Sequence, residues 1–273
     1  MNFTDALSRA ERQNNSRLCV GLDPDPAKFP GGWQDDSGRI FDFCAAIVDA
    51  TKDQVVAFKP QIAYFAAHSA EDQLQQLIAH IRNVAPQVLV ILDAKRGDVG
   101  STAEQYAREA FERFRADAVT LSPFMGLDSI EPYFAYLNKG LFLLCRTSNA
   151  GGADLQAQRL ANGDLLYEYV ARLANGEWSR GGQLGLVVGA TCPSEIERVR
   201  ALAPALPLLI PGIGAQGGDA SAAVRAGAKG QAPVILSSSR AVLYASSGAD
   251  FQAAARRAAM TARETLNAAW SLA

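Results

Sequence analysis

In the segment VLVILDAKRGD, a run of five aliphatic residues is followed by four charged residues within six positions. These charged residues are Asp93, Lys95, Arg96 and Asp98. Side chains alternate along a strand, so Asp93 and Lys95 point the same way if the chain stays extended as far as position 95. Arg96 then points the other way, and we expect it to be solvated. Because nearby carboxylates favour a charged ammonium, such a lysine suits proton donation better than Schiff-base formation.

Polar residues also follow other apolar segments of the chain. Asp23 follows the first segment, Lys59 lies near the end of the second, and Ser148 ends the fifth. Lys59 precedes Pro60, which favours an extended backbone at the lysine. Structural ion pairs also gather charge, so a catalytic cluster and a purely structural one are both compatible with this pattern.

Two further segments predict a phosphate-binding site. The segment PGIGAQGG has glycines that let the backbone approach a ligand closely, and Asp219 directly after it is expected to cap the next helix. The segment SSSRAVLYA offers hydroxyl groups and Arg240, whose guanidinium group can bind phosphate through two parallel hydrogen bonds. In an eight-stranded α/β barrel, the loops after strands seven and eight often bind phosphate.

Eight apolar segments alternate with amphipathic ones. Consecutive Val, Ile and Leu residues are typical of parallel strands covered on both faces, and they occur at 17–23, 54–60, 87–93, 117–123, 140–148, 185–191, 206–212 and 232–238. Helical periodicity occurs at 40–52, 71–85, 101–115, 128–137, 162–175, 194–203, 219–227 and 249–270. The alternation predicts the α/β fold class and a (β/α)₈ TIM barrel, as a single domain over residues 1–273. An open doubly wound sheet is the alternative, but the first strand lacks a G-x-G-x-x-G segment after it.

The start of one helix carries a specific signal. Residues 101–104 read STAE, which predicts a capping box with Ser101 as the N-cap and Glu104 reaching back to it.

Composition excludes several classes of protein. The 273 residues are 49% hydrophobic and 20% charged, with a net charge of −2, so no basic excess predicts a nucleic-acid partner. No apolar run approaches the roughly 20 residues that span a bilayer, and the polar N-terminus does not resemble a signal peptide. We therefore expect a cytoplasmic protein with no membrane contact. The four cysteines have no zinc-type spacing and the two histidines stand twelve positions apart, so no metal site is predicted.

Together these segments resemble orotidine 5′-phosphate decarboxylase, in the longer bacterial branch (type 2) of that family. The resemblance extends from about Leu18 to Tyr244 and departs from the familiar pattern at Ala150 and Ser237. The segments that carry it are GLDPDP (21–26), FKPQIAYF (58–65), LDAKRGDVGSTAEQYA (92–107), LCRTSNAGG (144–152), PGIGAQGGD (211–219) and SSSRAVLYA (237–245).

The resemblance implies a cofactor-independent decarboxylation of orotidine 5′-phosphate to uridine 5′-phosphate, the last step of de novo UMP biosynthesis. Lys95 resembles the lysine that protonates C6 of the pyrimidine, and Asp93 the acid that lies against the departing carboxylate. Lys59 and Asp98 would complete an alternating Lys-Asp-Lys-Asp array. Asp98 and Thr102, a ribose contact, would reach in from the other subunit of a homodimer with shared active sites.

The resemblance also implies how the rest of the nucleotide is bound. Asp23 would bind a ribose hydroxyl group, and Ser148 the edge of the pyrimidine. Gln216 and Arg240 would hold the phosphate, with Gln216 also closing over the base.

Two other functions remain open from the sequence. A metal-dependent sugar-phosphate decarboxylase or aldolase of the same superfamily would place Asp93 in a magnesium site with oxygen ligands. A non-catalytic sensor of a phosphorylated ligand could use the same fold, because fold does not determine function.

Overall fold

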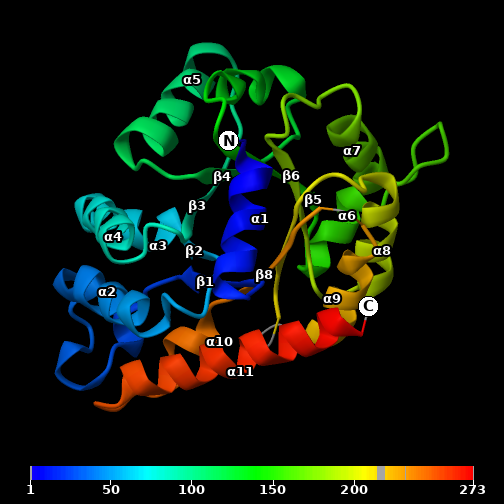
Figure 1. Ribbon diagram of the computed structural model, residues 1–273. Coiled ribbons are helices and arrows are strands. Elements are labelled where there is room, and N and C mark those ends of the chain that lie inside the picture. The colour runs from blue at the N-terminus through cyan, green and yellow to red at the C-terminus, as the bar shows by residue number, and fades with distance from the viewer. Residues whose placement is uncertain (1, 214–218, 231, 273) are drawn as a thin grey trace.

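The computed structural model describes residues 2–213, 219–230 and 232–272, and within them eight parallel strands form a closed barrel in chain order (Figure 1). Strand β8 pairs with β1, with Leu236 opposite Leu18, which closes the ring. The predicted (β/α)₈ barrel is therefore confirmed. The strands are β1 (Leu18–Leu22), β2 (Ala57–Pro60), β3 (Leu89–Arg96), β4 (Ala118–Leu121), β5 (Gly140–Arg146), β6 (Leu184–Val188), β7 (Leu208–Pro211) and β8 (Val234–Ser238).

Helices surround the barrel (Figure 1). The longer ones are α1 (Phe3–Asn14), α2 (Ile40–Thr51), α4 (Glu71–Val84), α5 (Gly100–Arg108), α7 (Leu166–Asn175), α8 (Pro193–Leu202), α9 (Ala220–Ala228) and α11 (Phe251–Ser271). The short ones are α3 (Ile62–Ala66), α6 (Ala153–Gln156) and α10 (Arg240–Leu243). Within the described ranges, none is long and apolar enough to cross a bilayer.

One hydrophobic cluster fills the barrel interior, and each strand contributes a side chain to it. These residues are Cys19, Ala57, Ile91, Ala118, Phe142, Val187, Leu209 and Ile235. Helix α1 closes the barrel end where the strands begin, because Phe3 and Leu7 belong to the same cluster. Phe3 packs edge-to-face on Phe142, with ring centroids 5.6 Å apart. A Cβ atom at Gly140 would lie 2.5 Å from the Phe3 ring, so β5 must begin with a glycine for α1 to seal the barrel.

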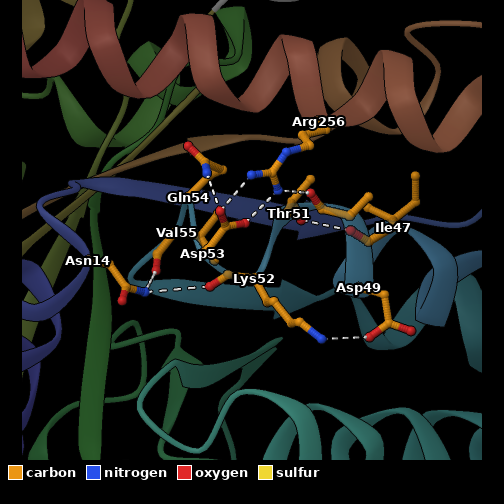
Figure 2. A network of polar contacts seen from close by, with 10 residues as sticks. Asn14, Ile47, Asp49, Thr51, Lys52, Asp53, Gln54, Val55 and Arg256 are labelled. Carbon is orange, nitrogen blue, oxygen red and sulfur yellow. Dashed lines mark hydrogen bonds and ion pairs between the residues drawn. The ribbon is translucent and has the colours of Figure 1, made fainter.

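A polar network joins both ends of the chain to the strand that carries Lys59. Arg256 of α11 donates to both carboxylate oxygens of Asp53 at 2.7 Å, just before β2 (Figure 2). Asn14, the last residue of α1, donates to the Val55 carbonyl at 2.6 Å. These contacts fix the turn between α2 and β2, and so the position at which β2 enters the barrel.

Two predictions about helices are wrong. Residues 128–137 form short 3-10 helices, η5 (Leu127–Ser129) and η6 (Glu131–Ala135), instead of an α-helix. Pro132 lacks the amide that an α-helix beginning at 128 needs at that position. The predicted cap by Ser101 is also absent, since α5 begins at Gly100 after Val99, without a side-chain cap.

Candidate active site

A cavity of about 700 Å³ opens at the ends of the strands, on the barrel face where the charged residues were predicted to gather. Its lining includes Asp23, Lys59, Asp93, Lys95, Ser148 and Arg240. These residues follow or end five different strands, which is the arrangement of active sites in this fold.

Asp93 lies between two ammonium groups. Its Oδ2 atom is 2.6 Å from Lys59 Nζ, and its Oδ1 atom is 2.6 Å from Lys95 Nζ. Asp93 and Lys59 are buried, whereas the side chain of Lys95 is 45% exposed towards the cavity. The ammonium group of Lys95 is therefore the member of the trio that a ligand can reach most easily.

Lys95 faces Asp93 for a reason other than regular alternation. The pairing of β3 with β4 shifts between Leu92 and Arg96, and Lys95 has a left-handed backbone with φ of 48°. The condition on which the prediction rested, an extended backbone as far as position 95, is thus not met, although the two side chains do meet. A left-handed backbone is uncommon for a residue with a Cβ atom, and it is found where the surroundings hold it in place.

Thr120 on β4 is a member of the cluster that we did not predict. Its hydroxyl group donates to Asp93 Oδ1 at 2.9 Å and accepts the backbone amides of Ala94 and Lys95, each at 3.0 Å. The only sequence signal for Thr120 was its position near the end of an apolar strand. β-branched residues are common in strands for packing reasons alone, so this position did not indicate a role in the site.

Opposite charges keep Asp93 and Lys59 ionised despite their burial. Burial disfavours the Asp93 carboxylate, but Lys59 and then Lys95 outweigh it and hold the pKa of Asp93 well below its usual range. Burial likewise disfavours the Lys59 ammonium, but Asp93 and then Asp23 raise its pKa above the usual value. At neutral pH the buried pair is therefore an ion pair.

Asp23 is held at the cavity edge by its backbone. Its carbonyl accepts the Tyr244 hydroxyl at 2.8 Å, and that hydroxyl accepts the Asp25 amide at 2.7 Å. The Oδ1 atom of Asp23 is buried and has no hydrogen-bond partner among the described residues. A Cβ atom at Gly21 would overlap Ser239 Oγ, so the glycine lets the ends of β1 and β8 approach. The Asp23 carboxylate is thus placed to accept a donor from a ligand.

The loop after β5 is fixed by Gln156, a second residue that the sequence did not reveal. Gln156 Oε1 accepts the Thr147 amide at 2.8 Å, and both residues line the cavity. Ser148, the predicted pyrimidine contact, follows directly and also lines the cavity. It lies so close to β6 that a Cβ atom at Gly189 would be 2.7 Å from its amide nitrogen.

The predicted phosphate site is described in part. Arg240 begins α10, is exposed at the cavity and has no ion-pair partner among the described residues. Asp219 caps α9 by accepting the Ala222 amide at 3.0 Å, as predicted. Gln216 lies outside the described residues.

Asp98 and Thr102 do not line this cavity. Asp98 Oδ1 accepts the Val99 amide at 2.8 Å, and Thr102 is exposed in the first turns of α5. Within the single chain, the structure therefore brings together Lys59, Asp93 and Lys95 but not the fourth member of the predicted array.

Arg96 is not the solvated residue that we expected. Its guanidinium group pairs with Glu109 at 2.9 Å and stacks over the Tyr106 ring, 4.5 Å from the centroid. It thereby anchors the end of β3 to the helical segment that follows.

Metal-ligating residues do not gather elsewhere in the described parts of the chain. Over residues 2–213, 219–230 and 232–272, no group of three His, Cys, Asp or Glu side chains is arranged to hold an ion. The four cysteines are free thiols; Cys19, Cys44 and Cys145 are buried, and Cys192 is half-buried.

Comparison with known proteins identifies the family. A family model described as "Orotidine 5'-phosphate decarboxylase / HUMPS family" matches residues 16–258. The chain belongs to this family. Over 272 residues it is 71% identical to orotidine 5′-phosphate decarboxylase of Polaromonas naphthalenivorans (strain CJ2), an alignment that covers 98% of this chain and 96% of the relative. The chain is 68% identical to the enzyme of that name from Leptothrix cholodnii, with 98% of each chain covered.

Solved structures of the family have the same fold. The structure of Leishmania donovani OMP decarboxylase superposes with a TM-score of 0.85 at 37% identity and covers 100% of both chains. A putative orotidine 5′-phosphate decarboxylase from Streptomyces avermitilis gives a TM-score of 0.81 at 32% identity, with 99% of this chain and 96% of that chain covered. The resemblance stated from the sequence is therefore confirmed.

Proposed function

We propose that this protein decarboxylates orotidine 5′-phosphate to uridine 5′-phosphate, the last step of de novo pyrimidine synthesis, without a cofactor. The observation that carries the proposal is the Lys59–Asp93–Lys95 array, with both ammonium groups 2.6 Å from one buried carboxylate at the cavity floor. The names of the relatives at 68% to 71% identity support the same reaction.

The array suits this chemistry because the reaction builds negative charge at one carbon. When the bond from C6 to the carboxylate breaks, carbon dioxide leaves and the electron pair stays on C6, which has no adjacent electron sink. The Lys95 ammonium stabilises this charge and then gives a proton to C6, leaving a neutral amine that regains its proton from solvent. One residue thus supplies both electrostatic stabilisation and general acid catalysis.

The rest of the cavity is assigned to the nucleotide. Arg240 and Gln216 hold the phosphate, the Asp23 carboxylate accepts a ribose hydroxyl, and Ser148 binds the pyrimidine edge. The cavity of about 700 Å³ has the size of a site for a small ligand of this class. Because the phosphate lies far from C6, its binding energy can help to assemble the charged array around the reacting carbon.

We also propose a homodimer whose two active sites each use Asp98 and Thr102 of the other subunit. In the single chain Asp98 and Thr102 lie outside the cavity, although they follow shortly after β3, the strand that carries Asp93 and Lys95. Exposed apolar side chains accompany them, since Val99 is 42% and Phe124 79% exposed. The segments that carry Val99 and Phe124 are adjacent, because the Ser122 amide donates to the Arg96 carbonyl at 2.7 Å. A two-fold interface here would make both sites composite.

Mixed dimers test the shared site. Combining Lys95→Ala with Asp98→Ala subunits should restore activity, because half of the mixed sites then have both side chains. Mixed dimers that stay as inactive as either parent would contradict the shared-site proposal.

Turnover of orotidine 5′-phosphate in excess chelator tests the main proposal. We expect full activity in wild type and a loss of about 10²- to 10⁴-fold in Lys95→Ala, the usual contribution of a general acid, with uridine 5′-phosphate still bound. Activity that disappears with chelator would favour the metal-dependent sugar-phosphate enzyme. Binding without turnover in the wild-type protein would favour the sensor.

A further inference from the structure

The Thr120 hydroxyl group uses its full hydrogen-bonding capacity on three consecutive residues of β3, which are Asp93, Ala94 and Lys95. Thr120 lies on β4, is 2% exposed and lines the cavity. A hydroxyl group offers one proton and two lone pairs. The amides of Ala94 and Lys95, each at 3.0 Å, occupy the two lone pairs, so the proton goes to Asp93 Oδ1 at 2.9 Å.

These three bonds occur where β3 departs from regular pairing. The register passes from Leu92 opposite Val119 to Arg96 opposite Leu121, so the residues between lack regular ladder partners on β4. The Thr120 hydroxyl accepts two consecutive amides in this gap, in place of a backbone carbonyl. Lys95 takes its left-handed backbone within the same gap. The hydroxyl therefore stabilises the turn that sends the Lys95 side chain back towards Asp93.

The hydroxyl also fixes the carboxylate that holds the proton donor. Lys95 has a flexible side chain that is 45% exposed, and its ammonium group is bound at 2.6 Å to Asp93 Oδ1. That same oxygen atom is the one that Thr120 binds, whereas Lys59 binds the other. Without the hydroxyl group, the two ammonium groups alone would set the rotation of the Asp93 carboxylate among the described side-chain contacts.

We propose that Thr120 is a positioning residue for the decarboxylation, which holds the Lys95 ammonium at the reacting carbon by fixing the Asp93 carboxylate and the backbone turn at Lys95. The inference rests on the proposed function. Thr120 acts through its hydroxyl group and not through its volume. A side chain with the same branching but without the hydroxyl group should therefore fold and bind the nucleotide while it places the proton donor poorly.

The test compares Thr120→Val with Thr120→Ser in the full-length protein. In Thr120→Val we expect kcat for orotidine 5′-phosphate to fall by between about tenfold and about a hundredfold, the effect of losing one hydrogen bond to an ionised group. The dissociation constant of uridine 5′-phosphate should stay unchanged, because its phosphate and ribose contacts remain. Thr120→Ser keeps the hydroxyl group and should recover most of kcat. If Thr120→Val does not fold, Thr120→Ala replaces it under the same criteria.

Thr51→Val is the matched control. Thr51 is also a fully buried threonine, and its hydroxyl group donates to the Ile47 carbonyl at 2.8 Å within α2, away from the cavity (Figure 2). Its loss should lower stability and leave kcat unchanged.

The outcomes separate this inference from the proposed function. A wild-type protein without activity on orotidine 5′-phosphate would refute the proposed function itself. An active wild type together with Thr120→Val at wild-type kcat would overturn only the positioning role. So would a Thr120→Ser variant as slow as Thr120→Val, or equal losses of kcat in Thr120→Val and Thr51→Val.

Discussion

Replacing Lys59 with Met should destabilise the barrel, because it leaves a buried carboxylate with one ammonium partner fewer. The side chains of Lys59 and Asp93 are only 7% and 9% exposed, and their charged atoms are 2.6 Å apart. Methionine keeps the apolar stem and removes the charge. Removing one member of a buried ion pair costs about 3–5 kcal/mol, since the other charge stays buried. Asp93 keeps Lys95 and Thr120, so we expect the lower end, about 3 kcal/mol.

The size of this effect should depend on pH in a defined direction. In the folded protein the pKa of Asp93 is below its ordinary value, because Lys59 and Lys95 outweigh the effect of burial. The stability gained from this shift is present above the unfolded pKa of about 3.9 and is lost as the pH falls through the folded pKa. Removal of Lys59 weakens the shift. The difference in free energy of unfolding between wild type and Lys59→Met should therefore be full at pH 7 and shrink as the pH falls far enough for Asp93 of the folded variant to take up a proton.

Equilibrium unfolding in guanidinium chloride, followed by both fluorescence and circular dichroism, measures this difference between pH 3.5 and pH 7. The control is Lys52→Met, because Lys52 pairs with Asp49 at 3.3 Å on the surface (Figure 2). Exposed pairs of this kind contribute at most about 1 kcal/mol. A loss in Lys59→Met no larger than in Lys52→Met would refute the reasoning, as would a difference that grows as the pH falls.

Three further substitutions test other parts of the structure. Arg240→Ala should lower kcat/KM for orotidine 5′-phosphate at least about tenfold, the value of a charged hydrogen bond, while turnover of orotidine without phosphate stays unchanged in steady-state assays. Tyr244→Phe removes the bonds to the Asp23 carbonyl and from the Asp25 amide, and should raise KM and lower the free energy of unfolding by about 1–2 kcal/mol in denaturant titrations. Arg256→Met should lower the free energy of unfolding by about 1 kcal/mol, because its pair with Asp53 is partly exposed, and should leave kcat/KM unaltered.

The barrel was predictable because each strand is covered on both faces and so reads as a continuous apolar segment. All five residues of β1 and of β8 are buried. Helix α1 was not predicted, although its buried residues Phe3, Leu7 and Ala10 have the i, i+4, i+7 spacing of an amphipathic helix. In segment 128–137 the periodicity predicted an α-helix that does not form. The missing amide of Pro132 overrides the helical periodicity there.

The charged part of the site was predictable for a different reason. Ionised residues at the ends of several buried strands must meet at one barrel face, so Lys59, Asp93 and Lys95 could be placed together from their positions alone. Thr120 could not, because a threonine in a strand needs no function to explain it. The direction of Lys95 was predicted from alternation, but it depends on a break in alternation that the hydroxyl of Thr120 stabilises.

The position of Lys59 on the far oxygen of Asp93 has a consequence for catalysis. In the reaction proposed above, the substrate would bring its own carboxylate towards Asp93, and two adjacent carboxylates raise the pKa of one of them. A protonated Asp93 would release the Lys95 ammonium group that it now binds at 2.6 Å. Lys59 opposes this, because it is buried and bound to Asp93 Oδ2 independently of the proton donor. We therefore expect Lys59 to be required for turnover although it never transfers a proton, since it keeps Asp93 ionised at the moment when the substrate carboxylate arrives.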